Sequence, residues 1–321
     1  MKIRSILVTL AAVLFCAASM SATSLHTWVS GSGSDSNACT FASPCATFNG
    51  ALAKTTAGGI ITAKDAGDFG TVTIAQSVTI DGSNLGSITG GTTATIAITT
   101  LANVTVQNLT INGTGSDAGI VVENGGIVIV DNCRIMNMSA DGIIFAGAGN
   151  LTVENSRIES FIGSSAAGIY VNANAAENVV VRNTVIDASP VSADSFGFFV
   201  SSGTGPVKAS LQNVTILGAG NSAVYSMSGV TEFAGSVLTQ SGFGVYATAG
   251  STISVASSMI TANTTGVCSN TGSKIRLDNN DIYDNSTAID NCGGIIKTSG
   301  TNKTSGTISI PASDVSNSVV F

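Results

Sequence analysis

The chain repeats one short pattern, which reads VTVQNLTI (104–111), VIVDNCRI (128–135) and LTVENSRI (151–158) in its first three clear copies. Five further copies follow: VVVRNTVI (179–186), ASLQNVTI (209–216), TEFAGSVL (231–238), ISVASSMI (253–260) and IRLDNNDI (275–282). The fifth positions of successive copies are 22 to 30 residues apart. This period, with alternating apolar residues and no helical periodicity, predicts a β-solenoid in which each repeat forms one coil.

A second pattern follows each copy and predicts another strand of the coil. It reads GIVV (119–122), GIIF (142–145), GIYV (168–171), GFFV (197–200), AVYS (223–226), GVYA (244–247), GVCS (266–269) and AIDN (288–291). With a third strand starting at the closing Ile of the first pattern, alternation places one apolar column of each strand inward. Less regular coils are expected upstream, at IITA (60–63), VTI (72–74), VTI (78–80) and IAI (96–98). We therefore expect about nine or ten coils.

The fifth position of the first pattern predicts a structural ladder. Asn occupies it in six of the eight copies: Asn108, Asn132, Asn155, Asn183, Asn213 and Asn279. The position falls at a bend between two strands, where Asn tolerates a left-handed backbone. Its amide can also hydrogen-bond its copy on the next coil, as in stacked Asn ladders.

The ends of the chain differ from the repeats. Residues 1–22 read as an export signal, because Lys2 and Arg4 precede a short apolar run and a stretch of small residues. Residues 23–56 form the expected capping segment, and 57–321 the β-helix. Within the cap we expect a short helix over 44–54, with Ser43 as its N-cap.

The cysteines fit an extracytoplasmic protein, secreted or periplasmic, because disulfides persist there. Apart from Cys16 in the expected signal, five remain. Cys39 and Cys45 flank a short loop, and Cys268 and Cys292 are 24 residues apart, about one repeat, so each of these two pairs is expected to form a disulfide. Cys133 is then left as a buried free thiol that acts as a small apolar residue.

Composition and charge exclude several classes of function. The chain has 12 basic and 19 acidic residues, and loss of the signal would leave a net charge of −9, so nucleic acid is not an expected partner. One histidine, His26, excludes multi-His metal sites, and no metal or cofactor is predicted. After the N-terminus no apolar run approaches the ~20 residues of a membrane span, so the mature chain is expected to lack one.

Together these features resemble the right-handed parallel β-helix proteins of the pectate-lyase-like superfamily. The resemblance rests on the Asn column, the GIxV pattern and the opening TWVSGSGSDSNACTFASPCATFNGAL (27–52). It implies an all-β, single-stranded right-handed parallel β-helix. This fold carries lyases, hydrolases, esterases, adhesins and inert scaffolds, so it does not fix an activity. The Asn-Thr-Asp, Asp-Asp and Gly-His-Gly motifs of the polygalacturonase-like members are absent.

The resemblance also implies a groove on the outer face of the GIxV strand. The outward positions there are Val121, Ile144, Tyr170, Phe199, Tyr225, Tyr246, Cys268 and Asp290. No cluster of carboxylates exists in this column to hold Ca²⁺, which takes six to eight oxygen ligands. Four consecutive aromatic residues, Tyr170, Phe199, Tyr225 and Tyr246, are instead the candidate ligand-binding residues. They fit either a stacking platform for sugar rings or a partner protein, or the ordinary preference of aromatic residues for strands.

One pair of carboxylates is a catalytic candidate. Asp131 and Glu154 hold the same outward position on neighbouring coils, which allows the ~5 Å separation of a retaining glycosidase pair, with Arg157 close by. The alternative is a solvated ladder of ion pairs, Asp131 with Arg134 and Glu154 with Arg157, each contributing ~0–1 kcal/mol.

Three functions follow from these residues. The first is an exported, non-catalytic protein that binds a polysaccharide, a cell-surface glycan or another surface partner through the aromatic column. The second is a polysaccharide lyase or a glycoside hydrolase-like enzyme acting on an acidic polysaccharide through Asp131 and Glu154. The third is an adhesin-like structural module without a defined ligand.

Overall fold

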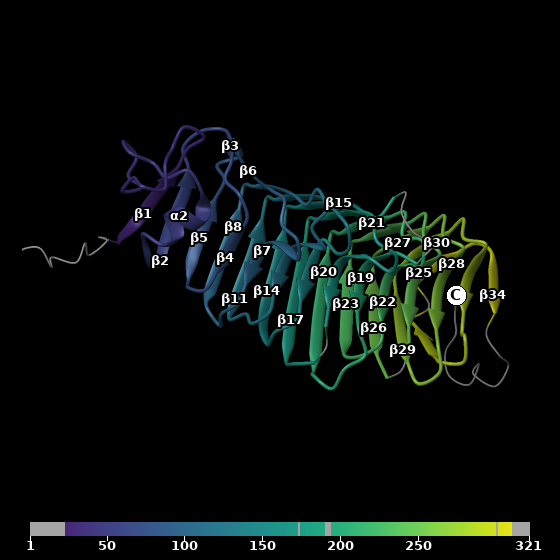
Figure 1. Cartoon of the computed structure of the whole chain (residues 1–321). Coiled ribbons are helices and arrows are strands. Elements are labelled where there is room, and N and C mark those ends of the chain that lie inside the picture. The colour runs from purple at the N-terminus through teal and green to yellow at the C-terminus, as the bar shows by residue number, and fades with distance from the viewer. Residues whose placement is uncertain (1–22, 173, 190–193, 249, 300, 310–321) are drawn as a thin grey trace, which may run out of the picture.

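The computed structural model describes residues 23–172, 174–189, 194–248, 250–299 and 301–309. The chain winds into an elongated parallel β-helix, with three sheets running along its length (Figure 1). The expected signal at 1–22 and residues 310–321, the end of the expected β-helix segment, lie outside the described residues. No helix in the described part of the chain has the length and apolar character needed to cross a membrane.

Each coil contributes one strand to each sheet. Sheet A, formed by the first repeated pattern, contains β1 (Ser24–Val29), β2 (Thr55–Ala63), β5 (Val78–Asp81), β8 (Asn103–Gln107), β11 (Ile127–Asp131), β14 (Gly149–Glu154), β17 (Glu177–Arg182), β20 (Val207–Gln212), β23 (Val230–Ala234), β26 (Thr252–Ala256), β29 (Lys274–Asp278) and β32 (Ile295–Thr298).

Sheet B follows the bend after sheet A. It contains β3 (Gly67–Asp68), β6 (Gly86–Thr89), β9 (Thr110–Asn112), β12 (Arg134–Met138), β15 (Arg157–Phe161), β18 (Val185–Asp187), β21 (Thr215–Leu217), β24 (Val237–Thr239), β27 (Met259–Thr261), β30 (Asp281–Tyr283) and β33 (Lys303–Thr304).

Sheet C is formed by the GIxV pattern. It contains β4 (Val72–Ile74), β7 (Ala94–Ile98), β10 (Ala118–Val122), β13 (Ile143–Phe145), β16 (Ala167–Val171), β19 (Phe196–Val200), β22 (Ser222–Ser226), β25 (Phe243–Ala247), β28 (Thr265–Ser269), β31 (Thr287–Asp290) and β34 (Thr307–Ser309).

The helix is longer than expected, with about eleven coils in the described residues rather than nine or ten. The upstream segments form β2, β4, β5 and β7 as expected. The additional coil at the C-terminal end comes from β32, β33 and β34, and β1 adds one more strand to sheet A at the N-terminal end. The last coil was not visible in the sequence because Thr298 and Thr304 stand where the preceding coil has Leu277 and Ile282.

The core is a stack of aliphatic side chains along the axis. Ile120 pairs in register with Ile96 and Ile143, and all three side chains are fully buried. Neighbouring strands lie about 4.8 Å apart, so each inward side chain packs on its copy in the next coil. The Gly of the GIxV pattern leaves room for this packing: a Cβ on Gly142 would lie 2.4 Å from Ile158 Cγ2 and 2.5 Å from the carbonyl oxygen of Gly168.

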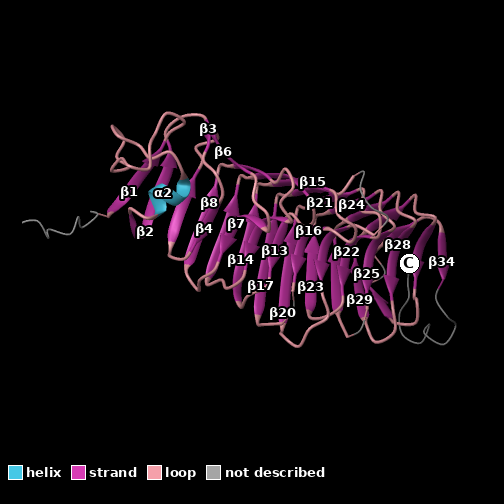
Figure 2. Cartoon of the chain, viewed as in Figure 1, coloured by secondary structure: helices cyan, strands magenta, loops and turns pink. Residues whose placement is uncertain are grey.

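The N-terminal segment contains one helical turn, α2 (Phe48–Leu52), coloured cyan in Figure 2. The expected helix over 44–54 with Ser43 as N-cap is wrong in extent. Cys45 forms a bridge with Val29 in sheet A and is therefore extended, so the helix begins later, with Thr47 as its N-cap. The role of this turn as a cap stays a prediction.

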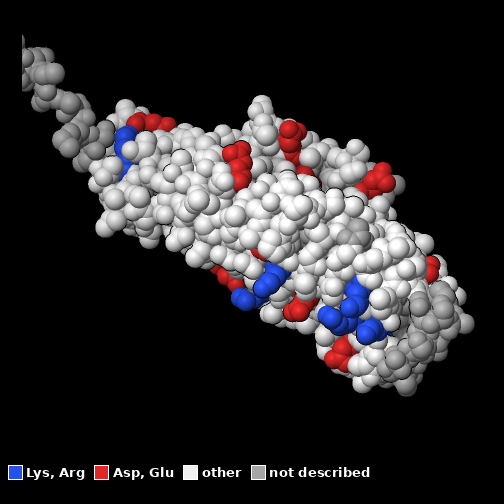
Figure 3. Space-filling view, turned by 90° about the horizontal axis from the view of Figure 1, so that it is seen from below, with Lys and Arg blue, Asp and Glu red and all other residues white. Residues whose placement is uncertain are grey.

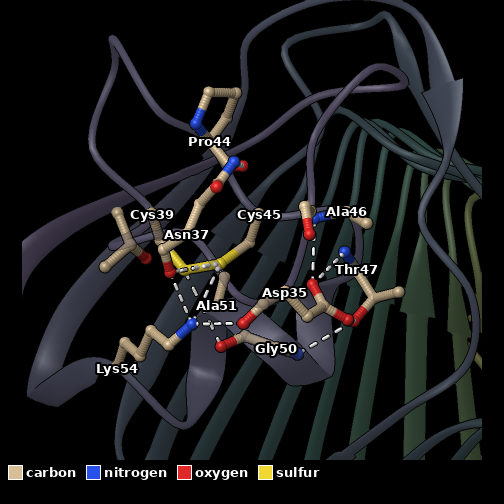
Figure 4. Close-up of a disulfide and its surroundings, with 12 residues drawn as sticks. Asp35, Asn37, Cys39, Pro44, Cys45, Ala46, Thr47, Gly50, Ala51 and Lys54 are labelled. Atoms are coloured by element: carbon tan, nitrogen blue, oxygen red, sulfur yellow. Dashed lines mark hydrogen bonds between the residues drawn. A yellow bond between two sulfur atoms is a disulfide. The ribbon is translucent and has the colours of Figure 1, made fainter. Parts of the chain in front are cut away.

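A disulfide and a carboxylate hold this segment, as Figure 4 shows. Cys39 and Cys45 are joined as expected. The carboxylate of Asp35 accepts hydrogen bonds from the backbone N–H groups of Ala46 and Thr47, both at 2.9 Å, and from the Thr47 hydroxyl. Asp35 thus fixes the start of the helical turn.

The bend between sheets A and B carries the expected Asn positions, each in the left-handed region, with φ from 47° to 56°. Asn132 donates to the Oδ1 of Asn108 at 2.8 Å, Asn183 donates to Asn155 at 3.3 Å, and Asn213 donates to Asn183 at 3.4 Å. Asn155 interrupts this row of Asn–Asn hydrogen bonds, because its side chain donates to Asp131 instead of Asn132.

Two further polar ladders are buried inside the C-terminal coils, and the sequence analysis missed both. Next to the Asn bend, Asn280 Oδ1 accepts from the N–H of Ser258 at 3.0 Å, and Asn302 Oδ1 accepts from the N–H of Asn280 at 2.9 Å. Between sheets B and C, Asn263 and Asn285 repeat this arrangement. The detectable signal was a spacing of 22 residues between their copies.

Candidate functional site

The aromatic column lies on the outer face of sheet C. The strands β16, β19, β22 and β25 pair so that Tyr170, Phe199, Tyr225 and Tyr246 are successive register partners. The residues that directly precede them in the strands, such as Phe198 and Val224, point inward and are fully buried. The four rings themselves are half-buried, so each presents part of its surface to solvent.

The four rings stack on one another. The ring centres of Phe199 and Tyr225 are 5.1 Å apart with planes 6° from parallel, and those of Tyr225 and Tyr246 are 5.0 Å apart at 10°. Tyr170 is tilted 36° from Phe199, with centres 5.3 Å apart. Parallel rings this close cannot lie side by side in one plane, so they are offset-stacked along the axis. The column therefore covers its own ring faces and exposes mainly ring edges and phenol hydroxyls.

A second row of rings supports the column from the same strands. Phe196 stacks on Phe199 with ring centres 4.7 Å apart, and Phe243 stacks on Tyr246 at the same distance. Phe196 is buried, so it fixes the tilt of its neighbours. Asn270 donates to the hydroxyl of Tyr246 at 3.1 Å. The sequence analysis missed the second row because Phe196 and Phe243 precede the Gly of the pattern.

The column ends at a disulfide on its C-terminal side. Cys268 is the register partner of Tyr246, and it is bonded to Cys292 as expected. On the N-terminal side the same outward positions hold Ile144 and Val121, both half-buried. An apolar surface thus continues over six coils, from Val121 to Tyr246.

The structure brings the carboxylate pair together but separates it from Arg157. Asp131 and Glu154 are register partners on β11 and β14, on the outer face of sheet A. Asp131 accepts a hydrogen bond from Asn155 at 2.8 Å. Arg157 lies beyond the bend, on β15 of sheet B, where its guanidinium contacts Glu159 and Asp187.

The expected ion pairs, Asp131 with Arg134 and Glu154 with Arg157, are therefore wrong. Glu159 instead binds both arginines, with Arg134 at 2.6 Å. Burial acts to raise the pKa of Glu159, but the hydrogen bonds from Arg157 and Arg134 outweigh it and hold the pKa below its usual value. The bend explains the difference, because it directs side chains on its two sides onto different faces.

Two grooves mark the outer surface, and only the first lies near these residues. One follows the Asn bend, has a volume of about 420 Å³, and is lined by Asn132, Asn155, Arg134 and Arg157 among others. The other, of about 540 Å³, crosses the outer face of sheet A near the C-terminal end. The sequence analysis missed the second groove. The sequence feature that could have indicated this groove is the set of small outward residues Ala234, Ser254 and Ala256.

Metal and thiol chemistry have little support in the described residues. They contain no group of three or more His, Cys, Asp or Glu side chains placed to hold a metal ion. Cys133 is a free, buried thiol, as expected. Burial raises its pKa to about 12, which keeps the sulfur protonated at neutral pH and unreactive as a nucleophile.

Known structures share this architecture. The structure is similar to the crystal structure of pectate lyase Pel9A, with a TM-score of 0.58 and 14% identity over 92% of this chain and 84% of that chain. It is similar to alginate lyase from Paenibacillus sp. str. FPU-7, with a TM-score of 0.54 and 14% identity over 87% of this chain and 100% of that chain. For the GH136 lacto-N-biosidase from Eubacterium ramulus the TM-score is 0.57, with 11% identity over 88% of this chain and 68% of that chain.

These identities establish a shared fold and no shared activity. No curated protein matches the sequence. A family model described as a right-handed beta helix region matches residues 59–231, which is more than half of the chain. The matched segment contains five of the six Asn positions of the bend, from Asn108 to Asn213, and the GIxV pattern from 119–122 to 223–226. The chain therefore belongs to the right-handed β-helix family.

Proposed function

We propose that the protein is an exported, non-catalytic β-helix protein that binds a carbohydrate chain along the aromatic column of sheet C. The observation that carries the proposal is the row of four half-exposed aromatic residues in strict register, continued by Ile144 and Val121. Contiguous apolar surface of this kind usually marks an interaction site. A polymer lying along the helix axis would meet one such residue per coil.

The stacking geometry defines how a sugar would bind. The ring faces cover one another, so a ligand meets ring edges and the hydroxyls of Tyr170, Tyr225 and Tyr246. Phenol hydroxyls both donate and accept hydrogen bonds, which suits the alternating C–H and O–H groups of a sugar. Both rows of rings also restrict the side chains before binding, which reduces the entropy lost on association.

Export fits the two disulfides, which persist in oxidising compartments. We propose that residues 1–22 are removed as the signal. The intact mass of the protein recovered from the periplasm or the medium tests this: a chain retaining residues 1–22 contradicts it.

Titration calorimetry with oligomers of polygalacturonate, alginate and cellulose tests the binding proposal. We expect wild type to bind at least one of them and Tyr225→Ala to bind it at least tenfold more weakly, because the central ring contacts both its neighbours. Tyr283→Ala is the matched control, since Tyr283 lies on β30 of sheet B, outside the column. Absence of binding by wild type, or equal affinity of Tyr225→Ala, would leave the aromatic column a structural feature of an adhesin-like module.

An enzyme remains the second candidate because Asp131 and Glu154 are register partners on an outer face. The similar structures named pectate lyase, alginate lyase and lacto-N-biosidase show that this fold carries such activities in those proteins. Assays for new reducing ends and for unsaturated products over a glycan panel decide between the two. Product formed by wild type and lost in Glu154→Gln would replace the binding proposal by a catalytic one.

A further inference from the structure

The groove on the outer face of sheet A has small side chains along its middle strand. It has a volume of about 540 Å³ and is lined by five successive strands, β20, β23, β26, β29 and β32. The outward residues of the middle strand, β26, are Thr252, Ser254 and Ala256. Longer charged side chains stand on the strands to either side, so the face is lowest along β26. Two such faces can approach each other closely along this strand.

The charges that line the groove balance, but they do not meet within the chain. Glu232 and Asp278 line it together with Arg276 and Lys297, so the groove has no net charge. Glu232 and Arg276 occupy the same outward column on either side of β26, with Ser254 between them, which places their strands about 9.6 Å apart. Glu232, Arg276 and Lys297 form no ion pair with any residue that the structure describes.

Two features of this face are unfavourable in an isolated chain. Arg276 and Lys297 are register partners, and like charges directly opposite each other destabilise a sheet. Val230 and Ile295, the first residues of β23 and β32, are 38% and 49% exposed. In Figure 3, acidic and basic side chains lie near one another towards the C-terminal end of the molecule. A partner that brings a carboxylate to the two cations and covers the two apolar side chains would remove both costs.

We propose that this face binds the same face of a second copy of the chain, in a two-fold dimer whose axis runs along β26. Rotation about this axis keeps the strand direction and reverses the order of the coils, so β23 lies opposite β29 of the partner. Glu232 then faces the partner's Arg276, and Arg276 faces the partner's Glu232. A guanidinium and a carboxylate placed in this way can form two parallel N–H···O bonds, and the symmetry makes the contact twice.

The other polar positions fit the same arrangement. β32 lies opposite β20 of the partner, so Lys297 faces the partner's Ser210, a short side chain. The partner's Glu232 is the next residue in that column, so one carboxylate lies near both cations. Asp278 faces the partner's Ala234, again a longer side chain opposite a small one. Each strand that carries long side chains therefore meets a strand that leaves room for them.

The apolar positions are covered by lysine stems. Val230 lies opposite the partner's Lys274, and Ile295 lies opposite the partner's Lys208. A lysine covers apolar surface with its methylene groups while its ammonium group stays in water. The face measures about 19 Å from β20 to β32, which is small for a specific interface, so we expect a reversible dimer with a Kd of about 10–100 μM. The aromatic column lies on sheet C and stays open, so the dimer does not depend on carbohydrate binding.

Sedimentation equilibrium at concentrations on both sides of this Kd tests the proposal by exchanging the two charges. We expect wild type to dimerise, with affinity falling as salt rises. Glu232→Arg and Arg276→Glu should each weaken the dimer at least tenfold, because each places like charges opposite each other. The double variant Glu232→Arg/Arg276→Glu should regain wild-type affinity. Glu123→Arg and Lys303→Glu are matched controls that reverse charges outside the groove, and they should keep wild-type affinity.

Crosslinking with a short bismaleimide tests the position of the axis. Ser254 lies on the axis and faces its own copy, so Ser254→Cys should give a crosslinked dimer. Thr152→Cys is the control, because Thr152 lies in the same column on β14, outside the groove, and it should stay uncrosslinked. A wild type that is monomeric at every concentration overturns the proposal. A dimer that neither single charge reversal weakens, or that the double variant fails to restore, also overturns it.

Equal crosslinking of Ser254→Cys and Thr152→Cys contradicts the proposed axis and overturns the assignment of this face.

Discussion

Glu177 is a carboxyl group at a position where the next coil has an aliphatic side chain. Its register partner on β20 is Val207, which is buried in the core. The Glu177 side chain is itself fully buried, and neither carboxyl oxygen has a hydrogen-bond partner among the described residues. Burial raises the pKa of this group to about 8. The folded protein therefore holds Glu177 in its neutral form at neutral pH.

This burial makes stability depend on pH. Between the usual pKa of 4.5 and the folded value near 8, the unfolded chain is ionised while the folded chain keeps its proton. Unfolding then releases a proton. With respect to this group, the free energy of unfolding is therefore highest below pH 4.5, and it falls by about 1.4 kcal/mol per pH unit between pH 4.5 and pH 8. Glu177→Met removes this loss, and we expect it to raise the free energy of unfolding at pH 8 by about 2–5 kcal/mol.

Urea unfolding followed by circular dichroism from pH 4 to pH 9 measures this difference. Glu123→Met is the control, because Glu123 is exposed in the turn after β10. The account of Glu177 is wrong if wild type and Glu177→Met keep a constant difference in unfolding free energy over this range.

Arg157 shows which residue contacts the sequence could not predict. Its outward position followed from alternation, but its partner did not, because ion-pair geometry depends on side-chain reach across coils. The sequence placed Glu154 three residues away, whereas the bend separates the two faces and brings Asp187 of the next coil within 2.9 Å of Arg157. Glu177 was missed for a related reason: alternation does not show where a strand begins.

At the scale of the element, the buried Asn residues replace aliphatic packing at the bends of the last coils. The Nδ2 of Asn280 donates to the carbonyl oxygen of Val255 at 2.9 Å, and its Oδ1 accepts from the N–H of Ser258. Ser258 lies at the bend after β26, whereas Val255 lies within β26. A buried polar group without a partner costs about 1–3 kcal/mol.

Replacing Asn280 should therefore lower the free energy of unfolding much more than replacing its neighbour Asn279. We expect Asn280→Ala to lower the free energy of unfolding by about 2–4 kcal/mol, since it removes both hydrogen bonds and leaves the N–H of Ser258 without the acceptor that Asn280 supplies. Asn279→Gly should change it by less than about 1 kcal/mol, because Asn279 is exposed with φ 51° and Gly235 occupies the same position two coils earlier. Equilibrium denaturation of both variants measures the difference, and equal losses would contradict the assigned role of the ladder.

The strands themselves were predictable, because one letter pattern recurs with inward columns of Ile, Val and Leu. Packing of each coil on the next requires this repetition of apolar residues, so the strands can be recognised from the sequence alone. The groove of sheet A was not predicted. It depends on Ala234 and Ala256 being smaller than Gln212 and Asp278 in the same column, and a hollow becomes visible only when coils are stacked in register.

At the scale of the whole molecule, each coil contacts mainly its neighbours, so stability is a sum of local terms along the axis. The two disulfides lie near opposite ends of the helix. Cys39–Cys45 holds the segment beside β1, and Cys268–Cys292 joins neighbouring coils at β28 and the turn after β31. Loss of either crosslink should therefore loosen one end and leave the other unchanged.

Hydrogen exchange measured by mass spectrometry on Cys268→Ala/Cys292→Ala tests this. A disulfide closing a loop of 24 residues contributes about 2–4 kcal/mol. In a solenoid this loss acts on the coils nearest the crosslink, so amides of β28 to β32 should exchange at least tenfold faster while those of β8 to β17 keep their rates. Cys39→Ala/Cys45→Ala is the matched control and should affect β1 and β2 instead. Faster exchange spread evenly over all coils would show that the helix opens as one cooperative unit, because a loss at one end would then reach the other.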